Sequence, residues 1–392
     1  MRTIGTHLRG IRAPIVKEGD NLIDIIITSL EKSIKENNYE LRNNDVIGVT
    51  ESVVARAQGN YVDIDDIAGE INDKFPDEIG IVFPILSRNR FAMILKGIAK
   101  SNKKIYLQLS YPNDEVGNPL LDERKLVERN INPYSDVITE EEYYKHFSDY
   151  KHPFTGINYI DLYKEIAEDN DIEIIISNKP ETILEYTNDV IAADIHTRFR
   201  TKEKLKKAGA NIVLGLDDIC NEDKGKGYNK EYGLLGSNKA TDKRLKLFPR
   251  DGQTFVDQVQ KKLKDKTGKR IEVMIYGDGA FKDPVAKIWE LADPVVSPAY
   301  TSGLEGTPSE VKLKYLADND LKDFKGDKLL KKMKDEIKNK EDDLVANIKS
   351  QGTTPRRLTD LLGSLCDLAS GSGDKGTPII LIQGYFDSLA DE

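Results

Sequence analysis

The sequence is poor in the residues that build disulfide frameworks and zinc sites. It contains two cysteines, Cys220 and Cys366, and four histidines without metal-binding spacing. This excludes a disulfide framework and a cysteine-based zinc site. Any bound metal is therefore expected to be a hard ion held by carboxylates, such as magnesium, manganese or calcium.

Long apolar runs are also missing. The longest runs, such as residues 174–176 and 379–382, have the length of a strand. They are far shorter than the roughly 18 consecutive apolar residues that span a bilayer. The opening residues, MRTIGTHLRG, lack the apolar block of a secretory signal peptide. We therefore expect a soluble, cytoplasmic protein with no membrane contact.

Positive charge is in deficit. Lysine and arginine number 58 against 67 aspartates and glutamates, which gives a net charge of −9. Nucleic-acid binders usually carry a basic excess, so we expect no nucleic-acid partner. With 392 residues, 39% of them apolar, the chain can form two domains, or one core with a large insertion. A small-molecule enzyme fits this composition better.

Strand and helix signals alternate along the chain and predict an α/β fold of mixed α+β character. Asp20 is the expected N-cap of the first helix. Expected helices cover 22–34, 63–74, 88–100, 160–169, 201–208 and 354–370, and expected strands cover 45–51, 79–83, 104–111, 172–177, 211–217, 270–277 and 378–384. We predict core segments 1–114 and 269–392 around an inserted α/β subdomain at 115–268, with charged, solvated helices in 312–350.

Two aspartates follow expected strands. Asp114 comes shortly after the strand ending at Tyr111, and Asp278 lies in the segment Gly277-Asp278-Gly279. Ligands of α/β sheets usually bind at the carboxyl ends of strands, where a carboxylate can hold a divalent ion on a phosphate. Aspartate beside glycine or asparagine is also a routine turn former. The residues alone leave both interpretations open and favour the turn.

The segment 50–59 begins at the end of another expected strand and contains one arginine, Arg56. Its guanidinium matches the geometry of phosphate oxygens. An exposed arginine on a short helix is the simpler alternative. The sequence contains neither a phosphate-binding loop signature nor a serine nucleophile elbow.

Four blocks, in this order and spacing, resemble the coenzyme F-420-0:L-glutamate ligase (gamma-glutamyl ligase) family. They are residues 9–20, 45–60, 271–282 and 358–384. The second block is similar to the family pattern K-x-V-S-K-x-E-G-R, the third to D-T-F-G-R-P and the last to P-x-x-x-I-R-G. The blocks cover about half of the chain, which would be a divergent member with a large insertion.

The resemblance implies a two-lobed ligase-like core and a homodimer. It also implies that GTP activates a small-molecule carboxylate, which then forms an amide with L-glutamate or a similar amine. Two divalent ions, manganese or magnesium, and a monovalent cation would assist. Such chemistry proceeds through an acyl phosphate, which must be shielded from water until the amine attacks.

The resemblance also assigns residues, although it names no catalytic side chain. Asp114 and Asp278 match metal-binding aspartates of the family. Arg56 matches the second lysine of K-x-V-S-K, near the nucleotide phosphates, and Ser52 stands in place of the first lysine. Apart from the resemblance, Glu51 and Glu305 are reserve candidates for metal binding or proton transfer, and a structural role is the favoured interpretation of each.

The sequence departs from the family at several charged positions. Gln58 replaces a glutamate, Asn60 an arginine, and Gln383 the arginine of the final strand. These changes keep two alternatives open. One is an amide ligase for a different carboxylate, and the other is a catalytically decayed nucleotide- or metabolite-binding protein.

Overall fold

The computed structural model describes residues 3–153, 155–167, 171–277, 280–282, 289–291, 296–341, 344, 347–350, 356–370 and 373–391. The fold is mixed α/β, as predicted. The chain divides into two compact units. Unit 1 comprises Met1–Ala57 and Asp251–Glu392, and unit 2 comprises Gln58–Arg250.

Unit 1 is built on a five-stranded sheet of order β1-β16-β2-β12-β15. Its strands are β1 (His7–Ile11), β2 (Val46–Thr50), β12 (Glu272–Gly277), β15 (Val296–Tyr300) and β16 (Ile379–Gln383). The central strands β2 and β12 run parallel, and the other neighbours are antiparallel. The carboxyl ends of β2 and β12 therefore lie at the same edge of the sheet.

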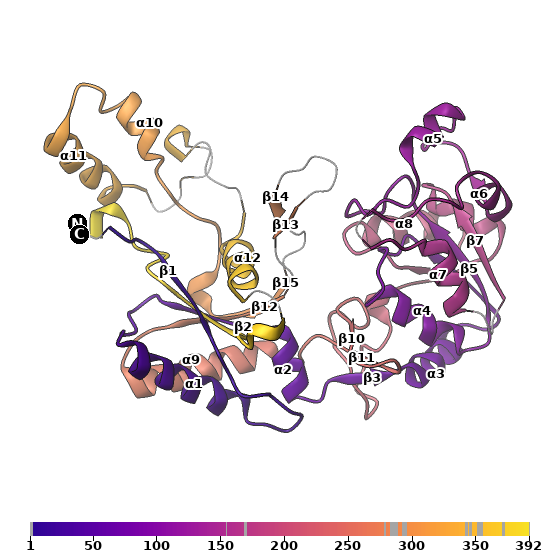
Figure 1. Cartoon of the computed structure of the whole chain (residues 1–392), viewed down its shortest axis with the longest axis horizontal. Coiled ribbons are helices and arrows are strands. Elements are labelled where there is room, and N and C mark those ends of the chain that lie inside the picture. Colours follow the sequence, from indigo (N-terminus) through magenta and orange to yellow (C-terminus); the bar gives the residue numbers. More distant parts are fainter. Residues whose placement is uncertain are drawn as a thin grey trace. The chain divides into compact units, whose positions relative to one another are not determined.

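Helices cover both faces of this sheet (Figure 1). Residues Ile47, Val49 and Ile275 pack with α1 (Leu22–Asn37) and α9 (Gly252–Thr267), whereas Val46 and Met274 pack with α12 (Leu358–Ser370). Successive side chains of a strand point to opposite faces of the sheet. A continuously apolar strand can therefore pack against helices on both faces. The cap of α1 is Asn21, whose Oδ1 accepts a hydrogen bond from the Asp24 amide at 3.2 Å. The prediction of Asp20 as the cap is therefore wrong by one residue.

The remaining elements of unit 1 are short. They are α2 (Glu51–Ala57), α10 (Leu313–Asp318), α11 (Gly326–Lys338) and the ribbon β13 (Ala280–Lys282) with β14 (Trp289–Leu291). None of the residues of α11 is fully buried. This agrees with the prediction of charged, solvated helices in 312–350.

Unit 2 contains a six-stranded sheet of order β6-β7-β5-β4-β8-β9. Its strands are β4 (Glu78–Val82), β5 (Lys104–Leu109), β6 (Ile138–Thr139), β7 (Ile172–Ile176), β8 (Asp189–Ala192) and β9 (Ile212–Gly215). All pairs are parallel except β6 with β7. From β4 the chain builds outward through β5 and β7, then crosses back to add β8 and β9 on the other side. The order therefore reverses between β4 and β8, and such a point is where open α/β sheets usually bind ligands.

Two layers of helices enclose the parallel strands of unit 2. Helices α3 (Ile64–Lys74), α4 (Phe91–Ala99) and α7 (Tyr159–Ile166) contribute to one core, while α8 (Arg198–Lys207) contributes to the other. Smaller elements are α5 (Glu123–Glu128), α6 (Glu140–His146), and a sheet of β3 (Tyr61–Asp63), β10 (Asn238–Lys239) and β11 (Arg244–Lys246). The last two strands pair antiparallel as a hairpin.

The observed boundaries differ from the predicted insertion at 115–268. Residues 58–114 belong to unit 2, because β4 and β5 pair with β7 and β8 rather than with the unit 1 sheet. Residues 252–267 form α9, which packs on β12 and β15 in unit 1. Burial patterns identify strands correctly, but they do not reveal which sheet a strand joins.

Candidate functional site

The parallel strands of unit 1 end side by side. Thr50, the last residue of β2, is the register partner of Tyr276 in β12. Helix α2 begins immediately afterwards with Glu51, which is 6% exposed. A Cβ atom added to Gly277 would lie 2.8 Å from the Cγ of Glu51. The Glu51 side chain therefore occupies space that the missing side chain of Gly277 leaves at this edge.

Two predicted phosphate-binding residues lie on α2. Ser52 and Arg56 are both exposed. They are four residues apart, so they lie on the same side of the helix. Asp278, the predicted metal ligand that follows β12, lies outside the described residues. Glu305 is exposed and follows the short helix η3 (Ser302–Leu304), and its hydrogen bond raises the pKa of the Tyr300 phenol.

Asp114 lies in unit 2, in the loop after β5, and is 7% exposed. Its Oδ1 accepts hydrogen bonds from the amides of Val116 at 3.0 Å and Asn118 at 2.8 Å. Its Oδ2 accepts from the Leu86 amide and from Nδ2 of Asn118, both at 2.8 Å. Burial raises the pKa of Asp114, and these hydrogen bonds act in the opposite direction. Asp114 thus joins the loops that follow β4 and β5.

This geometry bears on the metal predicted at Asp114. A carboxylate offers about four lone-pair positions, and four donors already use them. Asp114 therefore does not fit a metal ion unless it gives up a hydrogen bond. Within the described residues, no three histidine, cysteine, aspartate or glutamate side chains are grouped to hold a metal. Metal ligation by Asp114 stays a prediction.

Two further carboxylates, the half-buried Glu115 and the buried Asp194, lie at the same edge of the unit 2 sheet. Glu115 accepts hydrogen bonds from the amides of Ile195 at 2.5 Å and His196 at 3.1 Å, in the loop between β8 and α8. Asp194, fully buried, accepts from the hydroxyls of Thr197 at 2.6 Å and Thr201 at 2.7 Å. Burial raises the pKa of both carboxyl groups. Asp114 and Glu115, consecutive in the chain, thus join the loops after β4, β5 and β8.

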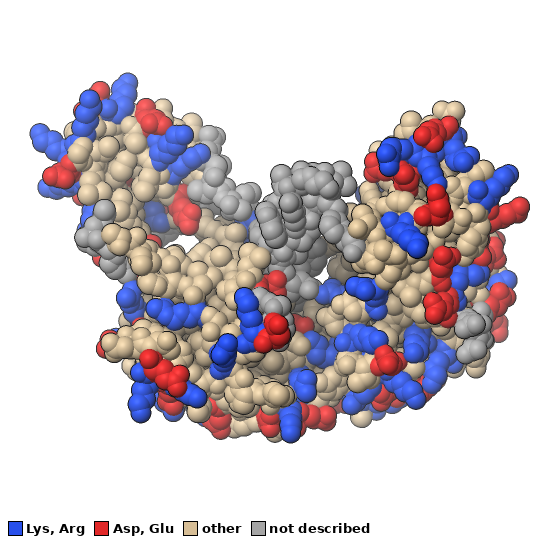
Figure 2. Space-filling model, viewed as in Figure 1, with Lys and Arg blue, Asp and Glu red and all other residues tan. Residues whose placement is uncertain are grey.

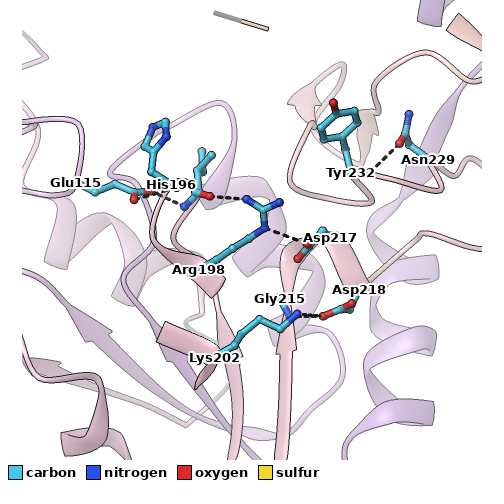
Figure 3. A network of polar contacts seen from close by, with 10 residues as sticks. Glu115, His196, Arg198, Lys202, Gly215, Asp217, Asp218, Asn229 and Tyr232 are labelled. Atoms are coloured by element: carbon cyan, nitrogen blue, oxygen red, sulfur yellow. Dashed lines mark hydrogen bonds and ion pairs between the residues drawn. The ribbon is translucent and has the colours of Figure 1, made fainter. Parts of the chain in front are cut away.

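Two ion pairs connect α8 to the residues that follow β9 (Figure 3). Arg198 donates from Nε to Asp217 at 2.9 Å, and Lys202 donates to Asp218 at 2.5 Å. Asp218 also accepts from the Gly215 amide at 2.7 Å. Sequence reasoning missed this network. The spacing of Arg198 and Lys202, four apart on a helix, and the adjacent Asp217-Asp218 were its only local signals.

The neutral amides at the departures from the family pattern have structural partners. Gln58 donates a hydrogen bond to the backbone carbonyl of Arg250 and accepts one from its backbone amide. Asn60, fully buried, donates to the carbonyls of Tyr228 at 2.9 Å and Phe248 at 2.7 Å. Gln383 donates to Asp45 at 2.7 Å and accepts from Arg9 at 2.6 Å. All three side chains are engaged within the fold.

The charged surface is mixed. On the face shown in Figure 2, lysine and arginine side chains alternate with aspartate and glutamate over the described residues. None of the described helices combines the length and apolarity that a bilayer crossing requires.

A family model described as F420-0:Gamma-glutamyl ligase matches residues 10–384. No curated protein sequence matches the chain. The matched range takes in nearly all of both segments of unit 1 and the whole of unit 2.

Proposed function

Because the chain belongs to the F420-0:gamma-glutamyl ligase family, we propose that it is a nucleoside-triphosphate-dependent ligase that forms a γ-glutamyl-type amide. The observation that supports this most is the match over residues 10–384. The match includes residues of both units and is not confined to one of them. The proposed substrates are a small-molecule carboxylate, with F420-0 as the first candidate, and L-glutamate or a similar amine.

The proposed reaction passes through an acyl phosphate. The carboxylate attacks the γ-phosphorus of GTP, GDP leaves, and the amine then displaces phosphate from the acyl carbon. In phosphoryl transfer the protein mainly positions the groups and balances developing charge. A divalent ion, manganese or magnesium, would supply charge neutralisation at the phosphates when bound. We also propose that a monovalent cation is a further cofactor of the reaction.

Ser52 and Arg56 are the proposed phosphate contacts. Both are exposed on α2, next to the edge where β2 and β12 end. An exposed guanidinium can form two parallel hydrogen bonds with phosphate oxygens. Asp278 is the proposed metal ligand at this edge by family resemblance. We further propose a homodimer in the cytoplasm.

A second candidate is a ligase for a carboxylate other than F420-0. The observation that favours it is the engagement of Gln58, Asn60 and Gln383 in hydrogen bonds within the fold. By resemblance to the family, Asn60 and Gln383 stand in place of arginines and Gln58 in place of a glutamate, so two cationic groups are absent here. A substrate with fewer negative charges than F420-0 would need fewer cationic contacts. A nucleotide-binding protein without turnover is the third alternative.

A thermal-shift screen with GTP, GDP, ATP and ADP, each with and without Mn²⁺, tests the proposal. Ligands that bind only the folded state raise the midpoint by mass action. We expect the largest shift with GTP and Mn²⁺ together. No shift with any nucleotide, with or without metal, would refute a nucleotide-dependent ligase. A shift without subsequent amide formation would identify the non-catalytic alternative.

A further inference from the structure

Glu115 connects two loops of unit 2 whose strands are not neighbours. It lies in the loop after β5, and its carboxylate accepts hydrogen bonds from the loop after β8 (Figure 3). In the sheet, β4 lies between these two strands, in the order β5-β4-β8. The side chain therefore bridges the loops that flank the carboxyl end of β4, where the order of the strands reverses.

The loop after β4 is tied into the same arrangement by the preceding residue. Asp114 accepts a hydrogen bond from the Leu86 amide of that loop at 2.8 Å. Open α/β sheets usually bind their ligands in the crevice between the loops that diverge at such a reversal. In unit 2 the loops after β4 and β8 are instead joined, through Asp114 and Glu115, by the chain itself.

The contacts of Glu115 are those of a bound anion. The Ile195 amide donates to Oε1 at 2.5 Å, and the His196 amide donates to Oε2 at 3.1 Å. Consecutive backbone amides that point at one group form a concavity suited to phosphate and carboxylate oxygens. Hydrogen bonds from such donors to a charged acceptor are stronger than those between neutral groups. The amides of Ile195 and His196 thus form an anion cradle, and the Glu115 carboxylate fills it.

We propose that Glu115 is an internal ligand, which fills the anion cradle of unit 2 and keeps it closed to small molecules that carry a carboxylate or a phosphate. The inference goes beyond the proposed function and does not rest on it, because it concerns a position in unit 2 that the ligase reaction does not use. For the ligase, a closed cradle leaves the exposed residues of α2 as the proposed phosphate contacts. Removal of the Glu115 side chain should open the cradle to an external anion.

Sodium formate is the probe, because it supplies the free carboxylate that Glu115→Ala removes. The thermal midpoint of the full chain is measured in sodium formate and in sodium chloride of equal ionic strength. Formate that binds only the folded state raises the midpoint by mass action, and we expect a saturable rise of about 2–4 °C for Glu115→Ala. The wild type and Glu128→Ala, which removes an exposed carboxylate of α5, should show no such rise. An equal response of all three proteins, or no response of Glu115→Ala, overturns the proposal.

Two further variants sharpen the test. Glu115→Gln keeps the cradle filled without the charge, so formate should not raise its midpoint, and a rise equal to that of Glu115→Ala refutes the proposal. Glu115→Asp withdraws the carboxylate by one methylene, and it takes the place of Glu115→Ala if that protein does not fold. A Glu115→Asp protein that does not respond to formate then counts against the proposal. No nucleotide is present in these measurements, so the ligase and the internal ligand can fail separately.

Discussion

Gln58 and Arg250, the first and last residues of unit 2, form hydrogen bonds with each other although 192 positions separate them. Nε2 of Gln58 donates to the Arg250 carbonyl at 2.6 Å, and its Oε1 accepts from the Arg250 amide at 2.7 Å. The Arg250 guanidinium donates from Nη2 to the Gln58 carbonyl at 3.0 Å. A primary amide can make the first two bonds at once because it carries both a donor and an acceptor. The ends of unit 2 are thereby held together.

The first prediction concerns this pair. Gln58→Leu keeps a similar volume but leaves the amide and carbonyl of Arg250 unpaired. We expect the free energy of unfolding to fall by about 1–3 kcal/mol, the usual cost of stranding partly buried polar groups. Urea denaturation measures it, with Gln258→Leu, which replaces an exposed glutamine of α9, as the control. If Gln58→Leu is as stable as the wild type, the hydrogen bonds between Gln58 and Arg250 do not hold the two ends of unit 2 together.

The second prediction separates the two roles considered for Asp114. Asp114→Asn replaces an acceptor oxygen with a donor that faces backbone amides, so we expect a loss of about 2–3 kcal/mol of unfolding free energy. The structural role predicts this loss in the absence of metal and nucleotide. Unchanged stability together with weakened Mn²⁺ binding would instead identify Asp114 as the metal ligand that the family resemblance implies.

The third prediction concerns pH and Asp194. Burial raises the pKa of this carboxyl above its ordinary value, so the folded state holds the proton more tightly than the unfolded chain. Its contribution to stability is greatest at acid pH and is lost as pH rises through the folded-state pKa. Asp194→Asn mimics the protonated side chain and removes this loss. Its stability relative to the wild type should therefore rise as the pH increases above about 4, the ordinary pKa of an aspartate, as followed by chemical denaturation. A difference that does not change with pH would contradict the assignment.

The fourth prediction uses a tight contact in the unit 1 core. A Cβ on Gly48 of β2 would collide with Sγ of Cys366 on α12. Gly48→Ala should cost about 1–3 kcal/mol through overpacking. Cys366→Ala removes the obstructing sulfur, so the double variant should be more stable than the sum of the two single losses implies. Additive losses would mean that the collision is relieved elsewhere.

Local elements were largely predictable, and their assembly was not. The spacing of Leu22, Ile26 and Leu30 predicted an amphipathic helix, and all three side chains are buried in α1. The strand β8 and the placement of β4 beside it were missed, because that pairing depends on contacts between distant segments. Hydrophobic periodicity carries no information about which distant strand will be the neighbour.

The candidate site shows the same limit. Position after a strand singled out Asp114 correctly as a residue at a sheet edge, yet its partner Leu86 is 28 positions away. Glu115 binds the amide of Ile195, which is 80 positions away, and received no prediction at all. Local residue types show which groups can act as ligands, whereas only the fold shows which of them are already engaged.

The most direct measurement is a product assay by mass spectrometry. The full chain is incubated with F420-0, L-glutamate, GTP and Mn²⁺, with omission of each component as the controls. We expect an F420-0 derivative heavier by one glutamyl residue, with one GDP formed for each amide and no product when any component is omitted. Recovery of F420-0, glutamate and GTP unchanged would contradict it.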